Sequence, residues 1–340
     1  MIQTQLKHAI EGATFSEKEA HSIMDHIMTG KVSSNQIASL LTILRMRGET
    51  VDELTGFAKS MRKHAVQFPQ PLEDAVDTCG TGGDDSGTFN ISTASAIVMA
   101  ALGVKVAKHG NRSFSSKSGS ADVLEQLNIP TQSGVEEAIQ ALDSHSMTFL
   151  FAPLYHPAMK HAVHPRKDIG FRTVFNILGP LCNPAGCSRQ LIGVYDHNLA
   201  RKMAQVVQRL GIQKALIVSG KDGLDECTIT TTTNVLVVTP DNIESMVIHP
   251  EDVGLKQGSL TEIQVKSPPE SAALIRRIFN GTSNPSAKNI VILNAAAGLV
   301  ASGKAETFTS AVPIVKDALE SGRVLNHYHH MTNTEERSYA

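Results

Sequence analysis

The segment DTCGTGGDDSGTFNIST, Asp77 to Thr93, decides the fold. It follows a short run at residues 75–77 that predicts a strand, and it leads into an apolar run that predicts a helix over residues 92–102. Four glycines crowd the connection between the two elements: Gly80, Gly82, Gly83 and Gly87. Because glycine lets the backbone approach a ligand closely and present its amide hydrogens, this connection suits a phosphate group.

The predicted helix begins with the small polar residues Asn90, Ser92 and Thr93. At the start of a helix, free backbone amides and the helix dipole favour an anion. The glycine pattern fits neither the GxGxxG dinucleotide motif nor the GxxxxGK[ST] loop of nucleotide triphosphatases. A tight strand-to-helix turn without a ligand is therefore the alternative interpretation of this segment when it is taken alone.

Short β-rich runs alternate with helical stretches through the rest of the chain. The runs that predict strands lie at residues 104–107, 147–151, 215–218 and 235–238. The helical patterns cover residues 135–142, 198–210, 271–279, 290–301 and 305–320. This alternation is typical of a mostly parallel sheet flanked by helices, so the fold class that we predict is α/β.

The first 65 residues predict a small bundle of three helices. Ser16 with Glu19, and Thr50 with Glu53, have the spacing of capping boxes, and another helix should begin near Ser33. Apolar residues recur at helical spacing after each of these starts. We therefore expect a small helical domain in front of the α/β domain.

Composition narrows the class of protein. Of the 340 residues, 41% are hydrophobic and 19% are charged, as in folded globular chains. Lysine and arginine together number 31, and aspartate and glutamate 33; the net charge of −2 argues against a general nucleic-acid binder. The four cysteines form no CxxC pair, and no signal peptide or membrane-length apolar run is evident. We expect reduced thiols and a cytoplasmic location.

Positive charge gathers in one segment of this nearly neutral chain. No acidic residue occurs from Ser86 to Ala121, and four cations give that stretch a charge of +4: Lys105, Lys108, Arg112 and Lys117. The part KHGNRSFSSKSGS, residues 108–120, surrounds these cations with small hydroxyl residues. Together with the glycine-rich loop, it favours an anionic small molecule over a merely solvated loop.

The segment KDGLDE, residues 221–226, ends in the adjacent carboxylates Asp225 and Glu226. Such a pair on a loop can hold Mg²⁺, which takes oxygen ligands and bridges to phosphates. Acidic pairs are also common on solvated surfaces, and that is the alternative interpretation.

The histidines do not predict a metal site. His156, His161 and His164 match neither HExxH nor a zinc-finger spacing. A second group lies near the C-terminus and is expected to be solvated: His327, His329 and His330.

Seven blocks in fixed order carry a resemblance to a known family. They are DTCGTGGD, TFNIST, KHGNR, SSKSGSADVLE, FAPLYHPAMK, GFRTVFNILGPLCNP and DGLDE. In this order and spacing the chain resembles the anthranilate phosphoribosyltransferases, from the N-terminal helices to about residue 325.

The resemblance implies a pentosyltransferase that acts in the second step of tryptophan biosynthesis from chorismate. Such an enzyme transfers the phosphoribosyl group of phosphoribosyl pyrophosphate (PRPP) to the amine of anthranilate. The products are N-(5-phosphoribosyl)anthranilate and pyrophosphate. The displacement is expected to be oxocarbenium-like, with Mg²⁺ as the cofactor that assists pyrophosphate departure.

The same resemblance implies the domain organisation. The helical domain would span residues 1–67, with a segment near 165–185 returning to it, and residues 68–75 would form a linker. The α/β domain would comprise residues 76–164 and 186–335. A homodimer through the helical domain is implied, with no nucleic-acid or membrane partner.

The family's functional positions carry over residue by residue. Those matching its PRPP-binding positions are Gly80, Gly83, Asp84, Thr88, Asn90, Ile91, Ser92, Thr93, Lys108, His109, Gly110, Asn111, Arg112, Ser113, Phe114, Ser115, Ser116 and Ser120. Those matching its anthranilate contacts are Gly80, Asn111 and Arg166. Those matching its magnesium ligands are Ser92, Asp225 and Glu226.

Two positions depart from the family pattern. Asp85 stands where the family often has a small residue, and Ser219 where it commonly has histidine. No general base is assigned, because a neutral aryl amine needs positioning more than proton abstraction. His109 is the one nearby candidate for that role.

Two rival functions fit the same scaffold. A pyrimidine nucleoside phosphorylase would bind phosphate and a nucleoside, and the intact DGLDE, KHGNR and Arg166 argue against it. A non-catalytic nucleic-acid-binding relative would need a basic surface and stacking aromatics. Here aromatic residues make up 4% of the chain and tryptophan is absent.

Overall fold

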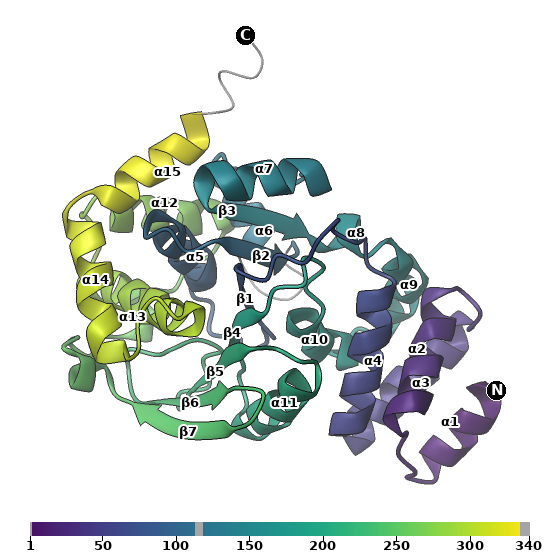
Figure 1. Ribbon diagram of the computed structural model, residues 1–340. Helices are drawn as coiled ribbons and strands as arrows, with labels where there is room; N and C mark the ends of the chain where they lie inside the picture. The colour runs from purple at the N-terminus through teal and green to yellow at the C-terminus, as the bar shows by residue number, and fades with distance from the viewer. Residues whose placement is uncertain (1, 113–117, 334–340) are drawn as a thin grey trace.

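The computed structural model describes residues 2–112 and 118–333 (Figure 1). Within them, one seven-stranded sheet has the order β3-β2-β1-β4-β5-β6-β7. The strands are β1 (Val76–Gly80), β2 (Val106–Gly110), β3 (Met147–Phe151), β4 (Arg189–Gly193), β5 (Lys214–Gly220), β6 (Thr233–Val238) and β7 (Ile243–Ile248). Strands β1 to β5 are parallel, and β6 runs antiparallel to both β5 and β7. The prediction of a mostly parallel sheet flanked by helices is confirmed.

Helices cover both faces of this sheet, as Figure 1 shows. The longer ones are α5 (Ile91–Ala101), α6 (Ser120–Gln126), α7 (Val135–His145), α11 (His197–Arg209), α12 (Pro268–Phe279), α13 (Pro285–Ser302), α14 (Phe308–Glu320) and α15 (Arg323–Asn333). Short elements fill the connections: α8 (Ala152–Tyr155), η1 (Pro157–Met159), η2 (Gly179–Leu181), η3 (Pro250–Val253) and η4 (Leu260–Glu262).

The core of the α/β domain forms around α5 and α13, which pack against each other. Both helices are apolar around most of their circumference, which requires burial on all sides. Asn294 is a fully buried polar residue in the middle of α13. Its side chain accepts a hydrogen bond from Cys227 N and donates one to Cys227 O, each at 2.8 Å, so α13 is fastened to the loop that carries the acidic pair.

Four helices form the N-terminal bundle: α1 (Ile2–Ile10), α2 (Glu17–Met28), α3 (Ser34–Arg47) and α4 (Val51–Lys63). Ser16, Ser33 and Thr50 cap the last three of them, as the sequence predicted. The expectation of only three helices was wrong, because α1 begins at residue 2 with no capping signal before it. Two later helices, α9 (Lys160–Ile169) and α10 (Val174–Leu178), pack against this bundle.

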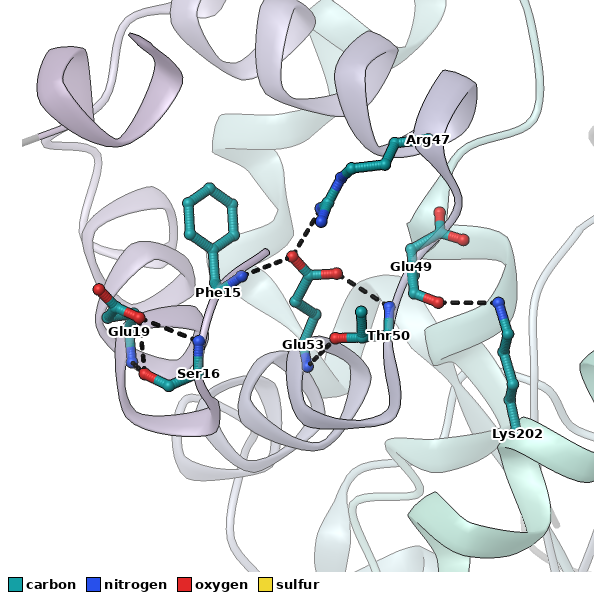
Figure 2. A network of polar contacts seen from close by, with 8 residues as sticks. All are labelled: Phe15, Ser16, Glu19, Arg47, Glu49, Thr50, Glu53 and Lys202. Carbon is teal, nitrogen blue, oxygen red and sulfur yellow. Dashed lines mark hydrogen bonds and ion pairs between the residues drawn. The ribbon is translucent and has the colours of Figure 1, made fainter. Parts of the chain in front are cut away.

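A buried carboxylate ties the bundle together (Figure 2). Glu53 is fully buried and accepts hydrogen bonds from Phe15 N and Thr50 N, each at 2.9 Å, and from Arg47 Nη2 at 2.6 Å. It therefore joins the start of α2, the end of α3 and the start of α4. Nearby, Lys202 of α11 donates to Glu49 O at 2.9 Å, which links the bundle to the α/β domain.

Several element boundaries differ from the expected ones. Strand β4 was not predicted, because its five residues include Arg189 and Gln190 and look polar in isolation. Strand β7 was missed because its apolar residues fall on both faces without a clear alternation, and most of the strand is exposed at the sheet edge. Helix α13 begins five residues early because Asn284 caps it, and α14 begins three residues late because Thr307 caps it. All four cysteines are free, and no described helix has the length and apolarity needed to cross a membrane.

Candidate active site

A cavity of about 450 Å³ lies at the carboxyl ends of β1, β2 and β3, between the sheet and the helical bundle. Ligands of open parallel sheets bind at this end of the strands. The glycine-rich loop forms one side, and the segments after β2 and β3 form another. Met61 of α4 closes the cavity from the bundle, so both domains contribute to it.

Glycine is required at two strand ends because the acidic pair approaches the backbone closely. A Cβ at Gly80 would lie 2.6 Å from Asp225 Oδ2, and one at Gly193 would lie 1.7 Å from Asp225 O. The loop of residues 221–226 therefore packs directly on the ends of β1 and β4. This contact explains how segments far apart in the sequence form one site.

The Asp225 and Glu226 side chains lie on the cavity wall, half-buried. Gly82 N donates to Asp225 Oδ2 at 2.8 Å. Burial, followed by the negative charge of Asp84, raises the pKa of Asp225 to about 7. Burial and the neighbouring Asp225 also raise the pKa of Glu226. Two close carboxylates that resist ionisation together form a site that a cation would stabilise.

Lys108 extends along the base of the cavity from β2. The residue is only 1% exposed, and its ammonium group donates to Thr78 O and, at 3.0 Å, to Ser92 Oγ. Ser92 lies in the first turn of α5, which Asn90 caps by accepting from Thr93 N at 2.9 Å. A fixed cation and the start of a helix thus face the same space, which suits an anion.

The stretch with a sequence charge of +4 is less basic in three dimensions. Arg112 forms ion pairs with Asp122 at 2.9 Å and Glu125 at 2.5 Å, and these hydrogen bonds raise its pKa. Lys105 pairs with Asp143 at 3.1 Å. Lys117 lies outside the described residues. The local-charge argument therefore rests on Lys108, because Arg112 and Lys105 are both paired with acidic residues that lie beyond the acid-free stretch.

Two histidine rings lie at the back of the cavity. His109 and His156 have ring centroids 5.1 Å apart, and a ring nitrogen of His156 donates to Cys182 O at 2.9 Å. Burial, then His156, lowers the pKa of His109 to about 3, and burial lowers that of His156 to about 4. Both imidazoles are therefore neutral at pH 7, and His109 is too weak a base to hold a proton in this environment.

Arg166, in the last turn of α9, presents its guanidinium to the cavity. Its Cζ lies 5.2 Å from the centroid of the Phe175 ring. Among residues 2–112 and 118–333, its guanidinium has no carboxylate or carbonyl acceptor. Burial lowers its pKa. An ordered, uncompensated guanidinium fork beside apolar side chains is suited to a planar carboxylate ligand.

Arg172 fastens the glycine-rich loop to the segment before α10. It donates to Gly83 O and to Asp85 Oδ1, the latter at 2.7 Å. Asp85 itself has a φ of 51°, a left-handed conformation that aspartate adopts more readily than most residues. The departure from the family pattern at this position is thus accommodated by local backbone geometry and an ion pair.

Most sequence-predicted site residues meet in this one cavity. Those that line it are Gly80, Gly83, Asp84, Thr88, Asn90, Ile91, Ser92, Lys108, His109, Gly110, Asn111, Arg112, Ser120, Arg166, Asp225 and Glu226. Thr93 does not line it, because its side chain is buried within α5. Four other predicted positions, Ser113, Phe114, Ser115 and Ser116, lie outside the described residues.

The residue-by-residue carry-over missed the apolar wall of the cavity. This wall is formed by Met61, Ala152, Pro153, Met159, Val163, Phe175 and Pro180, next to His156. All but Met61 and Val163 belong to the blocks FAPLYHPAMK and GFRTVFNILGPLCNP. The two blocks thus pointed to the right segments, but nothing in their sequence indicated which of their side chains face the cavity.

Two family models match the chain. The α/β-domain model of a glycosyl transferase family covers residues 72–325, and the helical-bundle-domain model of the same family covers residues 3–65. An anthranilate phosphoribosyltransferase of Halalkalibacterium halodurans is 53% identical over 338 residues, covering 99% of each chain.

Solved structures agree with these matches. The anthranilate phosphoribosyltransferase of Thermus thermophilus is 38% identical with a TM-score of 0.87, covering 96% of this chain and 98% of that one. The Saccharomyces cerevisiae enzyme in complex with PRPP and Mg is 25% identical with a TM-score of 0.88, covering 98% and 97%. With its two domains, its cavity and these relatives, the chain belongs to the anthranilate phosphoribosyltransferase family.

Proposed function

We propose that the cavity transfers the phosphoribosyl group of PRPP to the amine of anthranilate, giving N-(5-phosphoribosyl)anthranilate and pyrophosphate. One observation carries the proposal: an anion-binding loop, an acidic pair and an uncompensated arginine beside an apolar wall share one cavity. The first two match a pyrophosphate with its cation, and the third matches an aromatic carboxylate.

The phosphates of PRPP would lie between the glycine-rich loop and the start of α5. We assign this role to the predicted PRPP-binding residues that line the cavity, with Lys108 as the fixed cation. Backbone amides and a buried ammonium do not reorganise as charge builds on the departing pyrophosphate, so they stabilise that charge at low cost. Thr93 would act indirectly, through its hydrogen bond to the capping residue Asn90.

Mg²⁺ would be held by Asp225, Glu226 and Ser92. The oxygen donors fit this hard cation, and burial together with neighbouring carboxylates raises the pKa of both carboxyl groups, so a bound cation would stabilise their ionised forms. When bound, Mg²⁺ neutralises charge on the pyrophosphate leaving group. Lys108 keeps the Ser92 hydroxyl in place, and Gly82 N orients Asp225.

Anthranilate would bind against the apolar wall with its carboxylate on Arg166 and its amine near Asn111 and Gly80. The neutral aryl amine needs to be held in line with the ribose carbon rather than deprotonated beforehand. We assign no general base. His109, with its lowered pKa, would remain a neutral hydrogen-bonding group.

The test is the loss of anthranilate fluorescence when purified protein is mixed with PRPP and Mg²⁺. We expect loss only when all three are present, and no phosphorolysis of thymidine or uridine. The double variant Asp225→Asn with Glu226→Gln should slow turnover severely and weaken its dependence on Mg²⁺. The matched control changes another adjacent pair, Glu251→Gln with Asp252→Asn, which is exposed.

Two outcomes would count against the proposal. A folded protein that leaves anthranilate fluorescence unchanged would refute the reaction at this cavity. A normal magnesium titration in the Asp225 and Glu226 double variant would remove that pair from the mechanism while leaving the reaction in place.

We also propose the predicted domain division and a homodimer through the helical domain. The packing of α9 and α10 against the bundle supports a returning segment near residues 165–185. Ile10 and Met46 are 75% and 84% exposed on the bundle, which is unusual for large apolar side chains. Sedimentation equilibrium should give twice the chain mass, and Met46→Glu should shift it towards monomer; a monomeric wild type would refute the dimer.

A further inference from the structure

We propose that Asn294, in the middle of α13, is a positioning residue for the acidic pair Asp225 and Glu226. The inference rests on the function proposed above, in which this pair holds Mg²⁺. Asn294 does not line the cavity. It acts through the backbone of Cys227, the residue that follows Glu226, and so it contributes to the site without touching a substrate.

The amide of Asn294 lies in an apolar environment. The residue is fully buried, and it is the one polar side chain in the run of α13 from Ile290 to Ala301. Helix α13 packs between α14 and the sheet (Figure 1). Burying an amide without hydrogen-bond partners would destabilise the fold, so an asparagine at this position depends on the groups that it binds.

Those groups are present and fix the orientation of the amide. Asn294 Oδ1 accepts from Cys227 N at 2.8 Å, and Nδ2 donates to Cys227 O at 2.8 Å and to Ile290 O at 2.9 Å. A rotated amide would place a donor against Cys227 N and an acceptor against both carbonyl groups, so only one orientation fits. The side chain thus binds both the N–H and the C=O of Cys227, as a neighbouring strand would.

This two-point contact determines the direction of the Glu226 side chain. Cys227 N belongs to the same planar peptide group as the Cα of Glu226. The Cys227 side chain is 1% exposed and belongs to the core, whereas Glu226 and Asp225 line the cavity. Holding the backbone at residue 227 therefore keeps the acidic pair turned towards the cavity.

The same face of α13 contacts the helix that carries Ser92. Gly298 lies one turn after Asn294 on this face, and a Cβ at Gly298 would overlap the Met99 side chain of α5. Ser92 is in the first turn of α5. One helix face therefore sets the positions of all three proposed magnesium ligands, which come from two segments far apart in the sequence.

The base of the loop is closed by contacts that do not involve Asn294. Residues 221–232 connect β5 to β6, and Lys221 N donates to Thr232 O at 2.9 Å. Thr228 Oγ1 donates to Asp222 Oδ2 at 2.6 Å. Loss of the Asn294 side chain should therefore free the centre of the loop without opening its base.

The first measurement is hydrogen–deuterium exchange in Asn294→Ser, without substrates or metal. A serine hydroxyl can donate to Ile290 O within the helix but is too short to reach Cys227. Peptides that cover residues 225–230 should exchange about tenfold faster than in the wild type. Leu299→Ala is the matched control, because it removes a fully buried side chain from the same helix and leaves the contact with Cys227 intact. It should leave this exchange unchanged.

The second measurement is the rate of transfer in the same two variants. Asn294→Ser should lower kcat by about tenfold or more and raise the Mg²⁺ concentration that gives half the maximal rate. The KM for anthranilate should stay within about twofold of the wild type, because Arg166 and the apolar wall lie on other segments. Leu299→Ala should lower the melting temperature without changing the Mg²⁺ dependence. Asn294→Ala, which removes all three hydrogen bonds, replaces Asn294→Ser if circular dichroism shows that the serine variant is unfolded.

Three results would overturn the proposal. Unchanged exchange over residues 225–230 would show that Asn294 does not hold the loop. Faster exchange with normal kcat and normal Mg²⁺ dependence would show that it holds the loop without positioning the acidic pair. Equal changes in Leu299→Ala would show a general loss of packing. These results compare variants with an active wild type, whereas an inactive wild type would refute the proposed function itself, so the two failures are distinguishable.

Discussion

Replacing Arg166 by alanine tests the anthranilate site most directly. The guanidinium rests on the Phe175 ring and, within the described part of the chain, has no carboxylate partner, so its donors are free for a ligand. A hydrogen bond to a charged group contributes about 1.5–3 kcal/mol, which corresponds to roughly 10- to 150-fold in affinity. Arg166→Ala should raise the KM for anthranilate by this factor.

The KM for PRPP should stay within about twofold of the wild-type value, because the phosphate-binding elements lie on other segments. Arg166→Lys should fall between the wild type and Arg166→Ala, since lysine keeps the charge but loses the planar fork. Lys167→Ala is the control, because it removes an exposed cation from the next position of the same helix.

The assay is the initial rate of fluorescence loss, measured while anthranilate is varied at saturating PRPP and then PRPP at saturating anthranilate. An unchanged KM for anthranilate in Arg166→Ala would refute the assignment of this residue to the substrate carboxylate. Equal increases in both KM values would instead show that Arg166 supports the whole cavity rather than one substrate.

Three further predictions concern the supports of the site. Glu53→Ala should lower the free energy of unfolding, measured by urea titration, by about 3–5 kcal/mol, because it leaves an arginine and two backbone amides unpaired. Glu19→Ala is the control: it removes an exposed capping residue and should lower the same free energy by about 1 kcal/mol or less. Burial raises the pKa of Asp77 to about 6, so the folded state binds this proton more tightly than the unfolded chain, and stability falls as pH rises from about 4 to 6. Asp77→Asn should reduce that fall by roughly 3 kcal/mol, and an identical pH profile would contradict the burial argument. Arg172→Met should raise the KM for PRPP several-fold, because it releases the glycine-rich loop from Arg172. Asp85→Gly should change that KM less than twofold, since it removes only an exposed ion pair. A larger effect of Asp85→Gly than of Arg172→Met would contradict this interpretation.

How far the sequence predicts the fold depends on whether the signal is local. The caps at Ser16, Ser33 and Thr50 are local hydrogen-bonding patterns, and each helix begins where its cap predicts. Strand β4 is different, because Arg189 and Gln190 become strand residues only through pairing with β1 and β5 on both sides. Burial between neighbours that are distant in sequence leaves no pattern in the strand itself.

The site shows the same division between local and distant information. The glycine-rich loop and the acidic pair each suggested a ligand, but no spacing indicated that Asp225 would lie against Gly80 and Gly193. That contact raises the Asp225 pKa through burial, and so it turns a common surface motif into a cation site. The charge of the sequence overstated how basic the site is, because it could not show ion pairs. Arg112 belongs to a stretch without acidic residues, yet its partners Asp122 and Glu125 lie on helix α6, which follows that stretch. The local sequence therefore indicated which chemical groups are present. The pKa values and ion pairs of those groups depend on the distant segments that the fold places beside them.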